Sequence, residues 1–321
     1  MNEFDLIRTY FASQGLARDD VVVSLGDDAA VIAVPPDMQQ VVTTDVLVAG
    51  THFFEDTDPH SLGFKALAVS FSDLAAMAAT PAWFTLNLTL PEIEHGWLER
   101  FRDGLFQLAA EYQAQLVGGD TVRGPLAIGV QAGGVIPKGK ALLRSGACPH
   151  DCIYVTGNIG DAGLALLHKR GVLAAPERDA PVLLARLDYP MPRIREGMAL
   201  RDVASSCIDI SDGLLADLGH ILQASGVGAR VHVDRIPLSQ AFRRNFDRAG
   251  GWETAIASGD DYELCFTVPV GKAAIVQQLS AAWACGVTHI GDIEDSLGLR
   301  LIDEQGRARE PKLQGYDHFA G

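Results

Sequence analysis

Positive charge is scarce in this sequence. Its 321 residues include 26 Lys and Arg against 41 Asp and Glu, which gives a formal net charge of −15. Affinity for a nucleic-acid backbone or an anionic lipid surface comes from Lys and Arg, so we expect no nucleic acid and no membrane as partners. If the protein handles phosphates, another source such as a bound cation must supply the positive charge.

Cysteine and long apolar runs are also scarce. The five cysteines form no CxxC pair, and although Cys148 and Cys152 are close in sequence, no second Cys or His pair completes a zinc pattern. We therefore expect reduced thiols, mostly in the core. No run of about 18 uncharged apolar residues is present, and acidic residues stand near the N-terminus where a signal peptide needs basic ones. These features predict a cytoplasmic protein.

The common nucleotide and nucleophile motifs are absent. The sequence has no GxxxxGK[ST] loop, no HRD or DFG set, and no GxGxxG after a strand. It also has no HExxH and no GxSxG. Their absence argues against a P-loop enzyme, a protein-kinase fold and a dinucleotide enzyme, and leaves Ser or Cys nucleophilic catalysis without support.

Strand-like and helix-like patterns alternate along the chain, and 48% hydrophobic residues are enough for packed cores. A prior of about 150 residues per domain predicts two domains. We place the boundary at the start of a polar, turn-rich segment, which gives domains of residues 1–137 and 138–321. The alternation predicts an α/β or α+β chain in two parts.

The expected elements follow from apolar spacing. Helices are predicted over residues 4–11, 59–79, 94–113, 162–170, 182–187, 194–204 and 214–224. Strands are predicted over residues 21–25, 30–34, 41–48, 84–90, 116–117, 126–136, 153–156, 229–233, 263–268, 287–290 and 299–302.

The acids occupy informative positions. Six apolar segments each end in Asp beside Gly, Ser or Thr, and the acids concerned are Asp27 with Asp28, Asp45, Asp73, Asp120, Asp209 with Asp212, and Asp260 with Asp261. We expect several of these carboxylates at strand or helix ends near a core, where an unpaired charge is costly. Few basic residues lie near them in the sequence, the nearest being Lys65, Arg123 and Arg144. A cluster of Mg²⁺ ions would solve both problems, because hard cations bind carboxylates and phosphates together.

Each motif taken alone also has a plainer interpretation. Asp27 with Asp28 and the segment 118–120 fit ordinary turns, whereas Ser72-Asp73 and Ser211-Asp212 fit helix caps. His52 fits a structural histidine, and residues 157–161 weakly resemble a phosphate-binding glycine loop. Six caps or turns would not all need Asp at the end of an apolar run, so the joint pattern favours metal binding.

In this order and spacing, the motifs resemble the thiamine-phosphate kinase family. The resemblance covers nearly the whole chain and rests on Gly26-Asp27-Asp28, Thr43-Thr44-Asp45, Gly50-Thr51-His52-Phe53, Ser72-Asp73-Leu74-Ala75-Ala76-Met77, Gly118-Gly119-Asp120-Thr121, Ile208-Asp209-Ile210-Ser211-Asp212-Gly213, Asp261-Tyr262-Glu263-Leu264 and Gly315-Tyr316-Asp317-His318-Phe319. One segment departs from the family, which often has Ser-Gly-Gly-Glu-Asp where this chain has Ser258-Gly259-Asp260-Asp261.

The resemblance implies a fold like that of the aminoimidazole-ribonucleotide-synthetase superfamily. An N-terminal α/β domain would bind ATP and Mg²⁺ and pair its mixed sheet with that of a second subunit, and a C-terminal α+β domain would follow. The implied protein is a homodimer that phosphorylates thiamine monophosphate to thiamine diphosphate with ATP, the last step of thiamine diphosphate biosynthesis.

The resemblance also implies roles for single residues. The Mg²⁺ ligands would be Asp28, Thr43, Thr44, Asp45, Asp73, Asp120, Asp209 and Asp212. The ATP contacts would be Gly119, Asp120, Arg144 and Ser211, and the thiamine phosphate contacts would be His52, Asp260 and Tyr316. Of these, Asp45, Asp73, Asp120 and Arg144 would carry catalysis.

The expected mechanism is direct in-line transfer, because the acceptor phosphate oxygen is already anionic at pH 7 and needs no strong general base. Two other classes remain open on the residues alone: a metal-dependent phosphohydrolase that uses the same acids on water, and a metal or nucleotide binder without turnover. Within the superfamily, a selenophosphate synthetase would carry a reactive Cys near its N-terminus, and no Cys precedes Cys148.

Overall fold

The computed structural model describes residues 3–12 and 16–311. By their internal contacts the residues form two compact units, one of Met1–Leu74 with Ala79–Lys140 and the other of Ala75–Ala78 with Ala141–Gly321. In the described part of the chain, no helix is both long and apolar enough to span a membrane. All five cysteines lie within the described residues and are free thiols, as expected.

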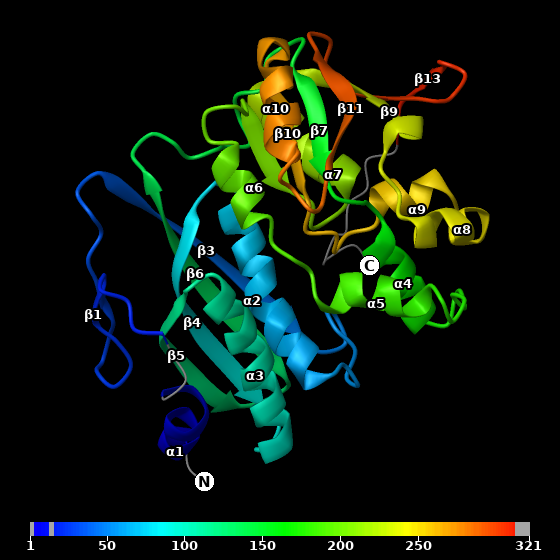
Figure 1. Ribbon diagram of the computed structural model, residues 1–321. Helices are drawn as coiled ribbons and strands as arrows, with labels where there is room; N and C mark the ends of the chain where they lie inside the picture. The colour runs from blue at the N-terminus through cyan, green and yellow to red at the C-terminus, as the bar shows by residue number, and fades with distance from the viewer. Residues whose placement is uncertain (1–2, 13–15, 312–321) are drawn as a thin grey trace. The chain divides into compact units, whose positions relative to one another are not determined.

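A four-stranded mixed sheet forms the centre of the N-terminal unit, in the order β3-β6-β4-β5 (Figure 1). Strand β6 pairs antiparallel with both β3 and β4, and β4 pairs parallel with β5. The strands are β3 (Met38–Val48), β4 (Thr80–Leu90), β5 (Gln115–Arg123) and β6 (Ala127–Pro137). A separate hairpin consists of β1 (Val21–Val23) and β2 (Val31–Ile32). The predicted mixed sheet is confirmed.

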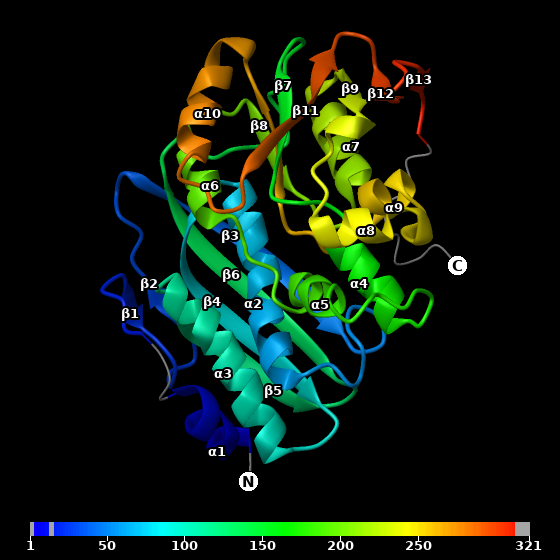
Figure 2. The ribbon, with the colours of Figure 1, turned by 45° about the vertical axis from the view of Figure 1, so that its right-hand side comes forward.

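Two helices lie side by side over one face of this sheet (Figures 1 and 2). They are α2 (Pro59–Ala76) and α3 (His95–Glu111), and α1 (Glu3–Ile7) continues into a π-helical turn η1 (Arg8–Ala12) near the edge strand β5. The two long helices approach closely because glycines stand at their contact. A Cβ on Gly63 would lie 2.0 Å from the Phe101 carbonyl oxygen, and one on Gly104 would lie 1.8 Å from that of His60.

The C-terminal unit contains a seven-stranded mixed sheet in the order β13-β12-β9-β11-β7-β10-β8. All neighbours are antiparallel except β12 and β9. The strands are β7 (Cys152–Thr156), β8 (Ser206–Asp209), β9 (Gly228–His232), β10 (Leu264–Val268), β11 (Val287–Glu294), β12 (Gly298–Ile302) and β13 (Ala308–Arg309).

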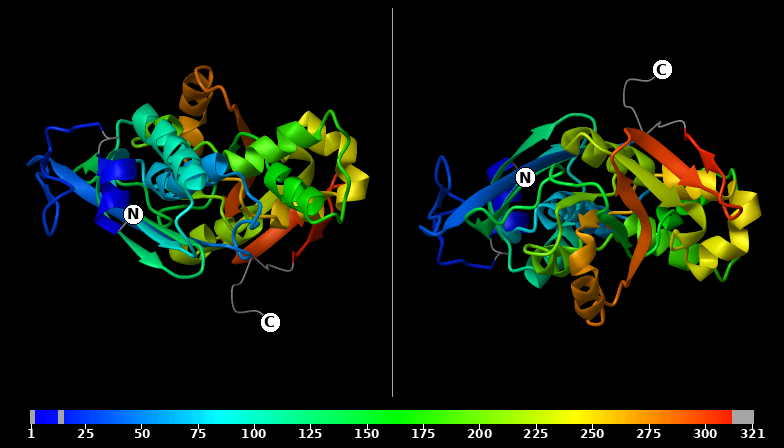
Figure 3. Two further views of the ribbon diagram at one scale, coloured as in Figure 1. Left: turned by 90° about the horizontal axis from the view of Figure 1, so that it is seen from below. Right: turned by 90° about the horizontal axis from the view of Figure 1, so that it is seen from above.

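Helices cover both faces of the seven-stranded sheet. Helices α4 (Asp161–Lys169), α5 (Ala180–Asp188), α8 (Gln240–Ala249) and α9 (Trp252–Ala257) gather at one side, where α7 (Leu214–Ser225) also packs (Figure 3). Their apolar side chains share a core with Ile153 and Val155 of β7. The opposite face carries Tyr154, which stacks on Phe266, and α6 (Ile194–Ala199) and α10 (Ala273–Ser280) lie toward that side (Figure 2). The short 3-10 turns η2 (Val233–Arg235) and η3 (Val270–Lys272) complete the unit.

Most predicted elements are present, with shifted ends. The helix predicted to reach residue 79 ends at Ala76, and the one predicted over residues 194–204 ends at Ala199. Strand β8 and helices α8, α9 and α10 were not predicted from the sequence. Helix α8 has a clear buried face that includes Phe242, but it is so polar that few apolar residues mark it in the sequence.

The expectation from the Asp motifs that these acids end their elements is wrong for three of them, although the strand predicted over residues 41–48 and the helix predicted over residues 59–79 already contain Asp45 and Asp73. Asp45 and Asp120 lie inside β3 and β5, and Asp73 lies inside α2. The cap interpretation of Ser72-Asp73 and the turn interpretation of residues 118–120 fail for the same reason. Strand β5 continues through its glycines because β4 pairs with it as far as Arg123, and cross-strand pairing overrides the local turn preference.

Candidate functional site

A pair of carboxylates lies between β3 and α2 in the N-terminal unit. Alternation along β3 places Thr43 and Asp45 on the same face. The Thr43 hydroxyl donates a hydrogen bond to Asp73, and the Ser70 hydroxyl donates to Asp45 Oδ2 at 2.7 Å. The structure therefore brings together three of the predicted metal ligands, Thr43, Asp45 and Asp73, and adds Ser70, which sequence reasoning missed.

The electrostatics of this pair suit a cation. Burial and then the neighbouring Asp73 carboxylate raise the pKa of Asp45, against the opposing effect of the Ser70 hydrogen bond, to about 6. Two carboxylates held this close repel each other when both are ionised. Carboxylate and hydroxyl oxygens are hard ligands, so the donor set fits Mg²⁺. The predicted metal role of this pair is consistent with its chemistry.

Thr44 and Asp120 lie elsewhere in the sheet. Alternation directs Thr44 to the face opposite Thr43, where it is exposed. Asp45 pairs with Val130 of β6, whereas Asp120 of β5 pairs with Asn87 of β4, one position farther along. Strand pairing therefore places Asp120 and the exposed Val46 in one row across the sheet, one position away from Asp45. Val46 and Asp45 are neighbours in β3 and point to opposite faces, so the structure does not bring the Asp120 side chain to the Asp45–Asp73 pair.

Gly119 and Asp120 form a second group with the loop after β1. Gly119 has φ +154°, and a Cβ there would lie 1.9 Å from the Leu86 carbonyl oxygen, so β5 requires glycine at this position. Leu25, Gly119 and Asp120 line one small pocket, which places the start of the loop that carries Asp28 beside Asp120. The Asp28 amide donates to Asp27 Oδ1 at 2.9 Å, as in a turn.

His52 closes the turn that follows β3. Its Nδ1 accepts a hydrogen bond from the Val48 amide at 3.0 Å, and its own amide donates to the Val48 carbonyl at 2.9 Å. The ring therefore holds the end of β3 in place. This contact agrees with the structural interpretation of His52 and leaves its predicted substrate role untested.

Two loops in the C-terminal unit bring the remaining acids together. The loop after β8 and the loop before β10 are joined by hydrogen bonds from the Asp260 amide to the Ser211 carbonyl at 2.9 Å and from the Tyr262 amide to the Ile210 carbonyl at 2.8 Å. A Cβ on Gly259 would lie 2.2 Å from the Ser211 carbonyl oxygen. Ser211 and Asp212 on one loop and Asp260 on the other thus lie on segments in direct contact, and Asp209 is the last residue of β8, just before the first loop.

Asp217 organises one of these loops and was missed by sequence reasoning. Its Oδ2 accepts hydrogen bonds from the amides of Ser211, Asp212 and Gly213 at 3.0, 3.1 and 3.2 Å. Burial and the adjacent Asp212 raise the pKa of Asp217 to about 7. The cap interpretation of Ser211-Asp212 is wrong, because Gly213 precedes α7 and no side chain caps it. The available signal was an acid within the apolar stripe of the helix predicted over residues 214–224.

The other predicted contacts are not gathered at these loops. The Arg144 carbonyl accepts a hydrogen bond from Ser225 at the end of α7, whereas Ser211 precedes its start. The 12 residues of α7 span about 18 Å, so the structure does not bring the backbone of Arg144 to Ser211. Tyr316 lies outside the described residues.

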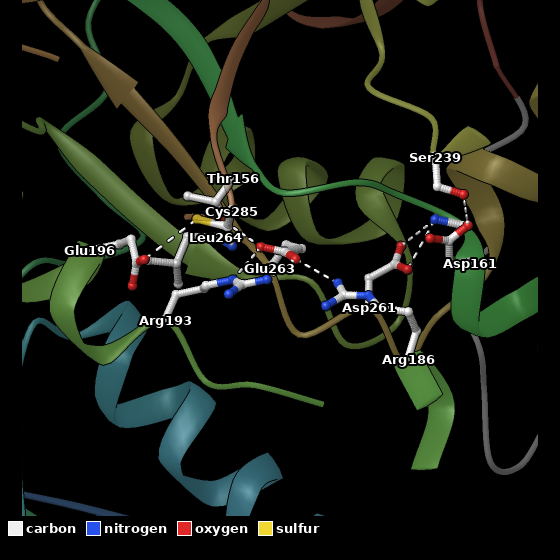
Figure 4. A network of polar contacts seen from close by, with 11 residues as sticks. Thr156, Asp161, Arg186, Arg193, Glu196, Ser239, Asp261, Glu263, Leu264 and Cys285 are labelled. Atoms are coloured by element: carbon white, nitrogen blue, oxygen red, sulfur yellow. Dashed lines mark hydrogen bonds and ion pairs between the residues drawn. The ribbon is translucent and has the colours of Figure 1, made fainter. Parts of the chain in front are cut away.

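A buried ion network anchors the loop before β10 (Figure 4). Glu263 is fully buried and accepts hydrogen bonds from Thr156 at 2.7 Å and from Arg186 and Arg193, each at 2.6 Å. Burial by itself raises the pKa of Glu263, but Arg193 and then Arg186 hold it below its usual range. These buried contacts fix the Asp261-Tyr262-Glu263-Leu264 segment in place and so position the adjacent Asp260.

The same network contradicts the phosphate-loop interpretation of residues 157–161. A Cβ on Gly157 would lie 2.0 Å from Glu263 Oε1, and the Gly160 amide donates to both carboxylate oxygens of Asp261 at 2.9 Å. Burial raises the pKa of Asp261 well above its usual range. The chain's own carboxyl groups occupy this loop.

Comparisons with known proteins cover both units. The AIR synthase related protein N-terminal domain matches residues 26–136, and the corresponding C-terminal domain matches residues 149–304. The thiamine-monophosphate kinase of Salmonella typhimurium is 49% identical over 324 residues, which cover 99% of this chain and 98% of that protein. The sequence-based resemblance is confirmed.

Solved structures agree. The crystal structure of thiamine-monophosphate kinase from Stenotrophomonas maltophilia matches with a TM-score of 0.86 and 43% identity, over 95% of this chain and 96% of that one. A structure described as AaThiL complexed with AMPPCP and TMP matches with a TM-score of 0.79 and 30% identity, over 92% of each chain. Because the identity to these kinases extends along nearly the whole chain, the chain belongs to the thiamine-monophosphate kinase family.

Proposed function

We propose that this protein transfers a phosphoryl group from ATP to the phosphate of thiamine monophosphate and so forms thiamine diphosphate. The observation that carries the proposal is 49% identity to a thiamine-monophosphate kinase along nearly the whole of both chains. The AaThiL structure complexed with AMPPCP and TMP supports a nucleotide and a thiamine phosphate as the two ligands.

Both units offer oxygen ligands for Mg²⁺. In the N-terminal unit we propose Thr43, Asp45 and Asp73, because their oxygens are close together and the pKa of Asp45 is raised to about 6 by burial and by Asp73. In the same unit we propose Asp28 and Asp120 at the β5 edge, and Thr44 in β3 at the other edge of the sheet. In the C-terminal unit we propose Asp209 and Asp212. When bound, Mg²⁺ neutralises the charge on the transferring phosphoryl group and on the acceptor.

The protein's own residues orient the reactants. Since the acceptor oxygen is already anionic, no residue has to remove a proton from it, and alignment can account for several kcal/mol of the barrier. We propose that Gly119, Asp120 and Ser211 contact ATP, together with the Arg144 guanidinium, and that His52, Asp260 and Tyr316 contact the thiamine phosphate.

The transfer is proposed to be direct, with no phospho-enzyme. The described site contains paired carboxylates whose neighbours are hydroxyls, an arrangement that suits cation binding better than nucleophilic attack. Rapid chemical quench with γ-labelled ATP should trap no labelled protein. A labelled, acid-labile adduct that forms and decays at the turnover rate would overturn direct transfer.

A homodimer is proposed through the open face of the four-stranded sheet. Val42, Val46 and Val122 are each at least half exposed there, and alternation places Val42 and Val46 on the face away from Asp45. Residues 1–137 would form the nucleotide-binding and dimerisation domain, and residues 138–321 the second domain. A cytoplasmic location is part of this proposal.

The assay uses the purified protein with ATP, MgCl₂ and thiamine monophosphate. Thiamine esters are separated by chromatography and detected as fluorescent thiochromes, with parallel samples that contain free thiamine or no acceptor. We expect thiamine diphosphate only from the monophosphate. ATP loss without thiamine diphosphate would instead indicate hydrolysis, and binding of ATP without turnover would indicate a nucleotide-binding protein.

A further inference from the structure

Three potential metal ligands converge on the seven-stranded sheet, away from the acids described above. Cys152 lies at the start of β7, and His289 and Asp292 lie in β11. One ligand atom from each lies within 4.8 Å of the other two. Cys152 and His289 are far apart in the sequence, so Cys/His spacing gives no signal for this group.

A β-bulge creates the convergence. His289 pairs with Tyr154 and Asp292 with Cys152, and the register shifts between His289 and Gly291. In a regular strand, residues three positions apart point to opposite faces. The extra residue at the bulge directs His289 and Asp292 to the face that carries Cys152 and Tyr154, and bulges commonly redirect side chains in this way.

We propose that Cys152, His289 and Asp292 bind one divalent cation of the zinc class, with water as the fourth ligand. Thiolate, imidazole and carboxylate together suit a borderline cation such as Zn²⁺, whereas Mg²⁺ prefers oxygen alone. None of the three residues belongs to the proposed phosphoryl-transfer set, so this proposal is independent of that function.

The distance between two of the three ligand atoms is already close to that in a tetrahedral zinc site. His289 Nε2 lies 3.2 Å from Asp292 Oδ1. Two ligands bound about 2.1 Å from a tetrahedral zinc ion lie about 3.4 Å apart, so these two atoms need little movement. The third ligand comes from the paired strand, and an ion would therefore cross-link β7 to β11.

The site is buried at Cys152 and partly open to solvent at His289 and Asp292. Cys152 is 7% exposed, whereas the side chains of His289 and Asp292 are 34% and 32% exposed, which leaves a route for an ion and water. Arg230 lies 3.9 Å from Asp292 Oδ2, the oxygen that is not turned toward His289. The Tyr154 ring packs 5.2 Å from the His289 ring and restricts its orientation.

Binding must rearrange two protons. His289 Nε2 now lies 2.8 Å from the Gly291 carbonyl oxygen, a distance at which Nε2–H donates. Metal ligation needs the Nε2 lone pair, so the histidine proton moves to Nδ1 and the Gly291 carbonyl turns to water. The Cys152 thiol loses its proton when it forms the metal–sulfur bond, so one proton is released for each ion bound.

The test uses Co²⁺ as a spectroscopic probe of the whole protein. After treatment with a chelator and its removal, Co²⁺ is added in excess Mg²⁺, which occupies oxygen-only sites. We expect one Co²⁺ per chain with thiolate-to-cobalt charge-transfer absorption and tetrahedral d–d bands, displaced by one equivalent of Zn²⁺. Cys152→Ser should abolish the charge-transfer band, and His289→Asn and Asp292→Asn should each weaken Co²⁺ binding by at least about tenfold.

A matched control is Cys148→Ser, since Cys148 is the exposed thiol nearest in sequence to Cys152. Its band should equal that of the wild type. The two surface variants His289→Asn and Asp292→Asn keep the test decisive even if Cys152→Ser folds poorly. No charge-transfer band in the wild type, a band that survives in Cys152→Ser, or unchanged affinity in both surface variants would overturn the proposal.

Discussion

In the C-terminal unit, the buried Glu263 carboxylate receives hydrogen bonds from Arg186, Arg193 and Thr156. In the N-terminal unit, the Asp45 carboxylate receives one from the Ser70 hydroxyl and lies beside a second carboxylate. The first acid has its pKa held below the usual range by the arginines, despite its burial, and the second has its pKa raised to about 6. Both are acids in predicted motifs, yet their neighbours differ in charge.

The difference separates acids that stabilise the fold from acids that are prepared for a ligand. A buried carboxylate between two guanidinium groups is compensated within the chain. A carboxylate beside another carboxylate becomes compensated only when a proton or a metal ion is present. Asp217 in the C-terminal unit is intermediate, because three backbone amides donate to it while burial and the adjacent Asp212 still raise its pKa to about 7.

The largest expected effect on stability comes from Glu263→Gln. The substitution leaves two partly buried guanidinium groups without their anion and should lower the free energy of unfolding by about 3–5 kcal/mol. Urea denaturation measures this change. Glu253→Gln is the control, because Glu253 is 83% exposed. A change below about 0.5 kcal/mol for Glu263→Gln would remove the distinction between the two kinds of acid.

A smaller effect is expected at Asp217. Asp217→Ala leaves the three backbone amides of the Ser211–Gly213 turn without an acceptor. The substitution should lower the free energy of unfolding by about 1–3 kcal/mol. Asp217→Asn keeps an acceptor oxygen and should cost less. Equal unfolding free energies for the two variants would mean that these hydrogen bonds do not hold the loop.

The smallest effect concerns pH and Mg²⁺. Because burial and Asp73 raise the pKa of Asp45 to about 6 from 3.8, the fold favours its protonated form. The resulting contribution of Asp45 to the free energy of unfolding is fully present below pH 3.8 and is lost as the pH rises through 6. Protons and Mg²⁺ compete for the same oxygens, so Mg²⁺ affinity should fall by up to about tenfold per pH unit below 6.

Thermal melting with and without MgCl₂ at pH 5 and pH 7.5 measures this competition. The Mg²⁺-induced rise in Tm should be larger at pH 7.5. Asp45→Asn should reduce the rise and its pH dependence, which separates Asp45 from Asp217, whose pKa is raised to about 7. A rise that is equal at both pH values would exclude a raised pKa at the metal ligands.

The sequence predicted the order of most elements and the family, because apolar periodicity and Asp-containing motifs are local signals. The strand predicted over residues 41–48 and the helix predicted over residues 59–79 already contain Asp45 and Asp73. The sequence could not predict that Asp120 lies inside β5, since pairing with β4 decides where that strand continues. It also missed Ser70 and Asp217, whose roles depend on neighbours brought close by folding. The β11 bulge is likewise a property of strand pairing that alternation does not reveal.

The most direct test of the central claim compares activity and stability in Asp45→Asn. If Asp45 is prepared for Mg²⁺, its amide variant should lose at least about 10²-fold in kcat for thiamine diphosphate formation while its Tm without Mg²⁺ is unchanged or higher, because repulsion from Asp73 is relieved. Asp103→Asn, at an exposed acid of α3, should leave both unchanged. A fall in Tm that matches the loss of kcat would contradict the account and make Asp45 a structural residue.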